Sequence, residues 1–361
     1  MSPRLELQQI VKSYDGVEAV RGVDMSLAPG EFLSLLGPSG CGKSTTLALI
    51  AGFETPSQGT ILVDGKSINT VPPGQRRIGL VFQDYAVFGR LTVLDNLSFG
   101  LEAQNVPRPE RKRRIAEIAE KLDLQSMLAR RGAGLNMSEM QRVALARVLV
   151  TEPRLLLLDE PMSNLDASMR AALRGELKLI QRGLGQTVLY VTHDQVEAMS
   201  MSDRIAVMRA GQIEQIGTPD EIYHHPATRF VAEFIGDPPI NMLPCTVTRS
   251  GNLMAATTAL HNALSLRRSD APEGEQILGV RPHDLHLSKT AVDGSAATTV
   301  RFIEKLGAED VVHLDYGDGL AAAIAAPGFA VPGERLWLSI DGTRAHVIRR
   351  DNGRVAMAEA A

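Results

Sequence analysis

A glycine-rich stretch near the amino terminus has the composition of a phosphate-binding loop. Residues 37–44 read GPSGCGKS and stand between an apolar run, EFLSLL, and a helical pattern. Glycine lets the backbone approach phosphate oxygens closely, and the N–H groups at the start of a helix point toward an anion. Lys43 adds a positive charge near the β and γ phosphates, and the Ser44 hydroxyl can bind Mg²⁺. The stretch therefore predicts a site for a nucleoside triphosphate.

Two acidic residues follow an apolar run further along the chain. The run RLLLLDEP places four leucines directly before Asp159 and Glu160. Open α/β sheets bind ligands at the carboxyl ends of their strands, so both carboxylates are expected near the phosphates. Asp159 would hold Mg²⁺ through water, and Glu160 would polarise the attacking water. Alone, two acids after an apolar run could simply begin a loop, but beside a phosphate loop they predict hydrolysis.

A third apolar run, TVLYVTHD, ends in His193. An imidazole at the carboxyl end of a core strand could reach a γ-phosphate. A single histidine is more often structural, but the position of His193 after a core strand favours a functional role.

Composition limits the classes of protein to consider. The 361 residues are 44% hydrophobic with a formal charge of −4, which predicts two domains and gives no basic field to gather nucleic acid. The amino terminus has no apolar signal region, and no window approaches the roughly 18–20 apolar residues of a membrane span. Cys41 and Cys245 lie far apart without metal-type spacing, which suits a reducing cytosol. We therefore expect a chain that is neither secreted nor membrane-spanning.

The pattern of elements changes once along the chain. From about residue 3 to 235, apolar runs alternate with helical patterns such as SMRAALRGELKLIQRGLG, which predicts α/β layers around a largely parallel sheet. After the connector FIGDPPINMLP, runs such as QILGVRP, TTVRFIEKL, VVHLDYG and RLWLSID predict a small β-domain of barrel type. A basic run at 108–122 indicates a solvated helical face, with an anionic partner as the alternative.

The ordered series of motifs resembles the ATP-binding cassettes of ABC transporters over essentially the whole chain. The phosphate loop is followed by VFQDYAVF, LLLLDEPMSNLDA and VTHDQVEAMSMSDRIAVM in the order of that family. The resemblance implies an α/β P-loop NTPase cassette at 1–236, with a helical subdomain at about 84–152. A small all-β domain of OB-like (TOBE) type is implied at 237–361, with a regulatory or dimer-contact role.

The resemblance also implies roles for individual residues. Tyr14 matches the aromatic residue that stacks on adenine, although a core tyrosine is the alternative, and Gln83 matches a sensor of the γ-phosphate and Mg²⁺. The implied catalytic residues are Glu160, His193 and Gln83, and the implied Mg²⁺ ligands are Ser44, Gln83 and Asp159. The implied ATP contacts are Tyr14, Gly37, Pro38, Ser39, Gly40, Cys41, Gly42, Lys43, Ser44 and Thr45.

In the family, two cassettes face each other head to tail, and each ATP lies between the phosphate loop of one and the signature loop of the other. Residues at this dimer seam are Asn136, Met137, Ser138, Glu139 and Asp166. The signature, usually of LSGGQ type, here reads LNMSE at 135–139, so its serine and both glycines are replaced. This is either tolerated drift or a loop that clamps ATP poorly. The second interpretation favours pairing with a different cassette over a homodimer.

The loop around Gln83 is expected to contact the membrane partner. The segment VFGRLTV lacks the Pro-His pair that the family usually has there, and Gly89 adds backbone freedom. The segment GDPPINML is most similar to cassettes of carbohydrate, polyol and glycerol-phosphate importers, while iron and polyamine cassettes share the same β-domain.

The resemblance thus predicts the ATP-hydrolysing, energy-coupling subunit of an importer, peripheral on the cytoplasmic face of the inner membrane. Its expected partners are permease subunits, a second cassette and, indirectly, an extracytoplasmic solute-binding protein. Nucleic acid is not expected. The alternatives are a nucleotide-gated switch in translation or repair and a mainly regulatory subunit with low turnover.

Overall fold

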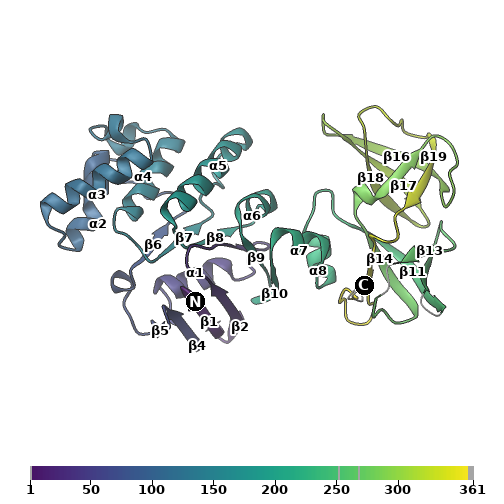
Figure 1. The fold of residues 1–361 in the computed structure, drawn as a ribbon, viewed down its shortest axis with the longest axis horizontal. Helices are drawn as coiled ribbons and strands as arrows, with labels where there is room; N and C mark the ends of the chain where they lie inside the picture. The colour runs from purple at the N-terminus through teal and green to yellow at the C-terminus, as the bar shows by residue number, and fades with distance from the viewer. Residues whose placement is uncertain (1, 251–252, 267–268, 357–361) are drawn as a thin grey trace. The chain divides into compact units, whose positions relative to one another are not determined.

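The chain folds into two compact units that divide at Pro219 (Figure 1). The computed structural model describes residues 2–250, 253–266 and 269–356. This division places α7 (Pro219–His224) and α8 (Arg229–Phe234) almost entirely with the second unit, whereas the sequence-based boundary at residue 236 groups them with the first. The buried side chain of Arg281 gives a physical reason, because it donates hydrogen bonds to carbonyl groups of both helices or their ends.

The first unit is built on a six-stranded sheet with the strand order β10-β9-β3-β8-β7-β6. Its strands are β3 (Phe32–Leu36), β6 (Ile78–Val81), β7 (Leu155–Asp159), β8 (Val188–Thr192), β9 (Arg204–Arg209) and β10 (Gln212–Gly217). All neighbours are parallel except β9 and β10. The residues of β3 and β8 are buried throughout, which is why these strands read as continuous apolar runs. The predicted parallel α/β core is confirmed.

A second, antiparallel sheet covers one side of the phosphate-loop helix. Its order is β2-β1-β4-β5, formed by β1 (Leu5–Tyr14), β2 (Val17–Leu27), β4 (Gln58–Val63) and β5 (Lys66–Ser67). Helix α1 (Lys43–Ala51) shares one hydrophobic core with strands of both sheets, including Leu7, Leu49 and Leu157. The start of α1 is therefore held rigidly between two sheets.

The remaining helices of this unit share a second core with the six-stranded sheet. They are α2 (Val93–Ala103), α3 (Arg108–Lys121), α4 (Met137–Leu149), α5 (Ala167–Leu184) and α6 (Gln195–Met201). Figure 1 shows α2, α3 and α4 grouped at one end of the unit, and all three lie between β6 and β7 in the sequence. Short 3₁₀ helices add η1 (Pro73–Gln75), η2 (Gln125–Met127) and η3 (Gly132–Gly134).

The basic run on α3 is largely neutralised by neighbouring glutamates. Arg113 lies 2.6 Å from both Glu110 and Glu117, and Arg114 lies 2.7 Å from Glu110. Arg111 pairs with Glu102. These ion pairs favour a solvated helical face over a binding surface for an anionic partner.

The second unit contains two five-stranded antiparallel sheets that share one large hydrophobic core, with a smaller cluster around Ile240 and Ile348. One sheet has the order β13-β12-β11-β14-β20, formed by β11 (Asn241–Ser250), β12 (Leu253–Thr258), β13 (Leu264–Leu266), β14 (Gly274–Val280) and β20 (His346–Ile348). The other has the order β15-β19-β16-β17-β18, formed by β15 (Leu285–Ser288), β16 (Ala296–Lys305), β17 (Asp310–Tyr316), β18 (Gly319–Ala325) and β19 (Arg335–Ile340), with η4 (Pro282–Asp284) before β15. The predicted small all-β domain is confirmed. Within the described part of the chain, no helix is long and apolar enough to cross a membrane.

Candidate functional site

The phosphate loop connects β3 to α1, and its glycines are required by the backbone. Gly40 and Gly42 have φ angles of 76° and 108°, a region that favours glycine. A Cβ atom on Gly37 would lie 2.2 Å from the carbonyl oxygen of Met208, and one on Gly42 would lie 2.6 Å from that of Ala19. Any other residue at these positions would force the loop away from β9 and β2.

The side chain of Lys43 is buried beneath the loop. Its Nζ donates hydrogen bonds to the carbonyl oxygens of Gly37, at 2.8 Å, and Pro38, at 3.0 Å. The loop is therefore wrapped around a positive charge at the amino end of α1. Among the other predicted ATP contacts, Pro38, Ser39, Gly40 and Ser44 are exposed, Gly42 and Thr45 are half-buried, and Gly37 and Cys41 are buried. Burial raises the pKa of the Cys41 thiol.

Two predicted catalytic side chains meet where neighbouring parallel strands end. Glu160 follows β7, His193 follows β8, and Nδ1 of His193 lies 2.9 Å from Oε2 of Glu160. The backbone N–H of Glu160 donates to the carbonyl of Val191 at 2.9 Å, which ties the two strand ends together. Glu160 has a φ of 43°, a left-handed conformation that is uncommon for glutamate. Such strain is typical of functional sites.

Asp159 lies one residue earlier, at the last position of β7, and is half-buried. Burial and, second to it, the nearby charge of Glu160 raise the pKa of the Asp159 carboxyl, while Lys43 lowers it. The carboxyl ends of β7 and β8 thus gather negative charge opposite the lysine of the phosphate loop. A bound cation would relieve this repulsion.

Gln83 and Tyr14 lie on exposed segments. Gln83 follows β6, and its backbone carbonyl accepts a hydrogen bond from Nδ2 of Asn164 at 3.3 Å. Tyr14 ends β1 and is 41% exposed, with Nζ of Lys12 located 4.8 Å from its ring centre. This exposure does not fit a core tyrosine.

The signature segment begins α4, and two of its residues form reciprocal hydrogen bonds. Oδ1 of Asn136 accepts the N–H of Glu139 at 2.9 Å, and the carboxylate of Glu139 accepts the N–H of Asn136 at 2.9 Å. This reciprocal capping box satisfies two amides at the helix start. Met137 packs against the helical core, and Ser138 is half-buried. The oxygen of the Asn136 carboxamide is thus used as a helix cap.

Arg130 is a residue that sequence reasoning missed. It lies 2.7 Å from Glu139 and also donates to the carbonyl of Gly134. The hydrogen bonds from Arg130 and, second, from the Asn136 amide lower the pKa of Glu139. An ion pair therefore holds the start of α4 together with the capping box. The sequence separation of Arg130 and Glu139 matches no known motif, so the sequence gives no signal for this pair.

Asp166 caps the next helix, α5. Its carboxylate accepts the N–H of Met169 at 2.9 Å and the hydroxyl of Ser168 at 2.7 Å. These bonds, the backbone one first, lower the pKa of Asp166. The residue is fully exposed at the start of the helix, so its other lone pairs face solvent.

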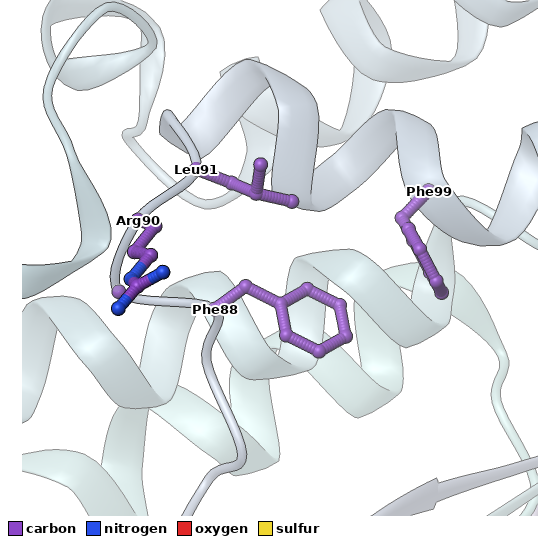
Figure 2. A pocket seen from close by; sticks show the side chains of 5 residues that line it. Phe88, Arg90, Leu91 and Phe99 are labelled. Carbon is purple, nitrogen blue, oxygen red and sulfur yellow. The ribbon is translucent and has the colours of Figure 1, made fainter.

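An apolar groove of about 350 Å³ lies on the helical part of the unit (Figure 2). It is lined by Phe88, Gly89, Arg90, Leu91 and Phe99. The rings of Phe88 and Phe99 lie 4.9 Å apart in an edge-to-face arrangement. Both are at least 40% exposed. The sequence had singled out this segment only through Gly89 and its missing Pro-His pair.

Comparison with known proteins agrees with this geometry. The family model "ABC transporter" matches residues 20–163, and the model "TOBE domain" matches residues 278–348. The chain is 40% identical to sn-glycerol-3-phosphate import ATP-binding protein UgpC 1 of Rhizobium johnstonii, covering 98% of this chain and 96% of that protein. It is 44% identical to spermidine/putrescine import ATP-binding protein PotA of Acidothermus cellulolyticus, covering 93% and 92%. It is also 44% identical to trehalose/maltose import ATP-binding protein MalK of Thermococcus litoralis, covering 87% and 88%.

A solved structure leads to the same class. CbiO1 of Clostridium perfringens, part of the ABC transporter complex CbiONQ, has a TM-score of 0.58 and 31% identity, covering 62% of this chain and 91% of that chain. The chain belongs to the family of ABC transporter ATP-binding proteins. Within that family it is an importer-type ATPase subunit with a carboxy-terminal TOBE domain. Such subunits bind nucleotide, dimerise and work with membrane permease subunits.

Proposed function

We propose that this chain hydrolyses MgATP at the junction of its phosphate loop with the carboxyl ends of β7 and β8. The observation that carries the proposal is the 2.9 Å contact between Glu160 and His193 beside a loop wrapped around Lys43. Glu160 polarises the attacking water, His193 contacts the γ-phosphate and orients Glu160, and Lys43 neutralises the β and γ phosphates. Gln83 senses the γ-phosphate, and Tyr14 stacks on adenine.

The residues present fit a magnesium ion that is bound together with the nucleotide. Ser44, Gln83 and Asp159 offer one hydroxyl, one amide and one carboxylate, all hard oxygen donors. Within the residues that the structure describes, no three His, Cys, Asp or Glu side chains form a cluster that could hold a metal alone. Mg²⁺ usually keeps several waters and binds through few protein groups plus phosphates. The ion would neutralise charge developing on the transferred phosphoryl group.

The signature segment supports pairing with a second, different cassette. Two copies of this chain facing each other would place LNMSE opposite both ATP sites, with Asp166 at the seam. In this segment the side chains of Asn136 and Glu139 cap the start of α4. A partner with an intact signature would complete the site built on Lys43 and Glu160. The segment 237–361 is the region we assign to regulation or dimer contact.

The groove lined by Phe88, Leu91 and Phe99 is the proposed contact for the permease. Exposed aromatic side chains around a groove are typical of protein interfaces. Tyr85 connects this segment to the ATP site, because its hydroxyl donates to the carbonyl of Pro161 at 2.9 Å, one residue after Glu160. Movement at the nucleotide can therefore reach the groove. The chain would then lie peripherally on the cytoplasmic face of the inner membrane.

The transported solute is proposed to be a carbohydrate, a polyol or a glycerol-phosphate-like compound. The printed names of relatives such as UgpC 1 and MalK support this class. A polyamine is the second candidate, because PotA matches at 44% identity over nearly the whole chain. An extracytoplasmic solute-binding protein and the permease would carry the specificity, and this chain would supply the energy.

Deletion of the gene, followed by uptake assays, tests the proposal. Loss of labelled sn-glycerol 3-phosphate, glycerol or maltose uptake, restored by the wild-type chain but not by Glu160→Gln, would support it. Loss of spermidine uptake alone would favour the second candidate. If the chain purifies without membrane proteins and uptake of every solute is unchanged, the importer proposal for this site is wrong.

A further inference from the structure

A buried carboxylate lies directly behind the loop that carries His193. Glu197, in α6, is 2% exposed, and its Oε2 accepts hydrogen bonds from the hydroxyls of Tyr190 and Thr192, both at 2.7 Å. Tyr190 is itself fully buried and packs against Phe32 with ring centres 5.6 Å apart. Both of these hydrogen-bond partners are neutral hydroxyl groups. Burying a glutamate costs more than burying an apolar residue of similar size, so its hydrogen bonds to Tyr190 and Thr192 point to a positional role.

The network continues from Glu197 to both neighbours of His193. Thr192 has a single hydroxyl proton, which it donates to Glu197, and its oxygen accepts the N–H of Asp194 at 2.9 Å. Oδ1 of Asp194 in turn accepts the N–H of Glu197 at 3.1 Å and caps α6. The residues on each side of His193 are thus fixed by one closed circuit. Each bond in it has only one possible direction if Glu197 is ionised.

This hydrogen-bond network leads to His193, which contacts Glu160. His193 is more than half exposed, so packing alone does not hold its ring. Its orientation depends on the contact with Glu160 and on the backbone that Thr192 and Asp194 fix. Arg170 also faces this network, because its guanidinium lies 3.9 Å from the carboxylate of Asp194.

We propose that Glu197 is a positioning residue for ATP hydrolysis, which acts through Thr192 and Asp194 to hold His193 against Glu160. This inference rests on the proposed role of His193 in the site. Glu197 itself does not touch the nucleotide. Its loss should slow turnover without weakening the binding of MgATP, because the phosphate loop and Tyr14 are not part of the circuit.

A double-mutant cycle on the full chain tests the inference, with steady-state phosphate release from MgATP as the readout. Glu197→Gln should lower kcat about tenfold, with KM changed less than about twofold, since the amide oxygen still accepts the Thr192 hydroxyl but a neutral acceptor holds it more weakly than a carboxylate does. In a His193→Ala background, the same substitution should cause no further loss. Glu120→Gln, on the exposed face of α3, is the matched control. Equal losses of kcat in both backgrounds, or a change in KM alone, would overturn the inference.

A pair of variants at Thr192 decides the question if Glu197→Gln does not fold or His193→Ala has no measurable turnover. Thr192→Ser keeps the hydroxyl and should retain at least half the wild-type kcat, whereas Thr192→Val keeps the shape and should lose about tenfold. Equal kcat in the two variants would overturn the positioning role. Wild-type turnover in His193→Ala would overturn the proposed function of His193 as well as this inference. The failure of the inference alone can thus be told apart from the failure of the proposed function.

Discussion

Glu160 occupies a strained backbone position between two strand ends, and its carboxylate contacts His193. We expect Glu160→Gln to retain ATP binding and to lower turnover by at least about a hundredfold, because an amide keeps the shape but cannot act as a base. Phosphate release and binding of a fluorescent ATP analogue measure the two properties. Glu117→Gln, an exposed change on α3, serves as the control. Unchanged hydrolysis in Glu160→Gln would rule out this residue as the base.

The phosphate loop wraps around the side chain of Lys43, whose Nζ donates to two carbonyl oxygens of the loop. Lys43→Ala should weaken ATP binding by roughly a hundredfold, since it removes the cation near the β and γ phosphates. Titration with a fluorescent ATP analogue gives the affinity. Lys43→Met retains the buried stem and should bind as weakly, which assigns the effect to charge. Wild-type affinity in either variant would mean that the loop is not used for phosphates.

At the scale of elements, the start of α4 depends on an ion pair between Arg130 and Glu139. Because the hydrogen bonds from Arg130 and Asn136 lower the pKa of Glu139, the carboxylate stabilises the fold above its unfolded pKa of about 4.3. This stabilisation is lost as pH falls through the lower folded value. Glu139→Gln should therefore lower the thermal midpoint near pH 7, and the deficit should shrink below about pH 4.

Thermal unfolding of both proteins from pH 3 to 7 measures this difference, in a range chosen around the unfolded pKa of about 4.3. Glu120→Gln should show no comparable pH dependence, because that glutamate is exposed on α3. A deficit that stays constant across the range would show that the charge of Glu139 does not matter and that the capping bond alone carries the effect.

At the scale of the whole molecule, the altered signature segment predicts an unequal pair of ATP sites. The chain alone should hydrolyse ATP slowly, and a triple variant that restores the signature, Asn136→Ser, Met137→Gly and Ser138→Gly, should be about a hundred- to a thousandfold faster. Addition of a cassette with an intact signature from the same transporter should also raise turnover. Equal rates for the chain alone and the triple variant would contradict unequal pairing.

Stability must be checked beside these rates, because glycine at the first helical positions costs up to about 1 kcal/mol each. Serine at position 136 remains a good helix cap, so α4 should still form. The thermal midpoint of the triple variant, compared with that of the unmodified chain, separates a loss of folding from an effect on catalysis.

The sequence by itself determined the elements and the chemistry of the phosphate loop. The apolar runs that became β3, β7 and β8 were readable because strands buried on both faces are apolar throughout. The residues that follow these strands, Glu160 and His193, were predictable for the same reason. Local rules apply there, since the strand, the turn and the helix start are all encoded within a few residues.

Only the tertiary structure decided which side chains touch. The contact of Glu160 with His193 requires β7 and β8 to be neighbours in register. The ion pair of Arg130 with Glu139 requires the segment between them to fold so that Arg130 lies against the start of α4. The groove of Phe88 and Phe99 likewise forms when a loop packs beside α2. Periodicity reports whether a side chain is buried, but the partner of a polar group depends on the packing of separate elements. The sequence could therefore place the catalytic chemistry but not the contacts that orient it.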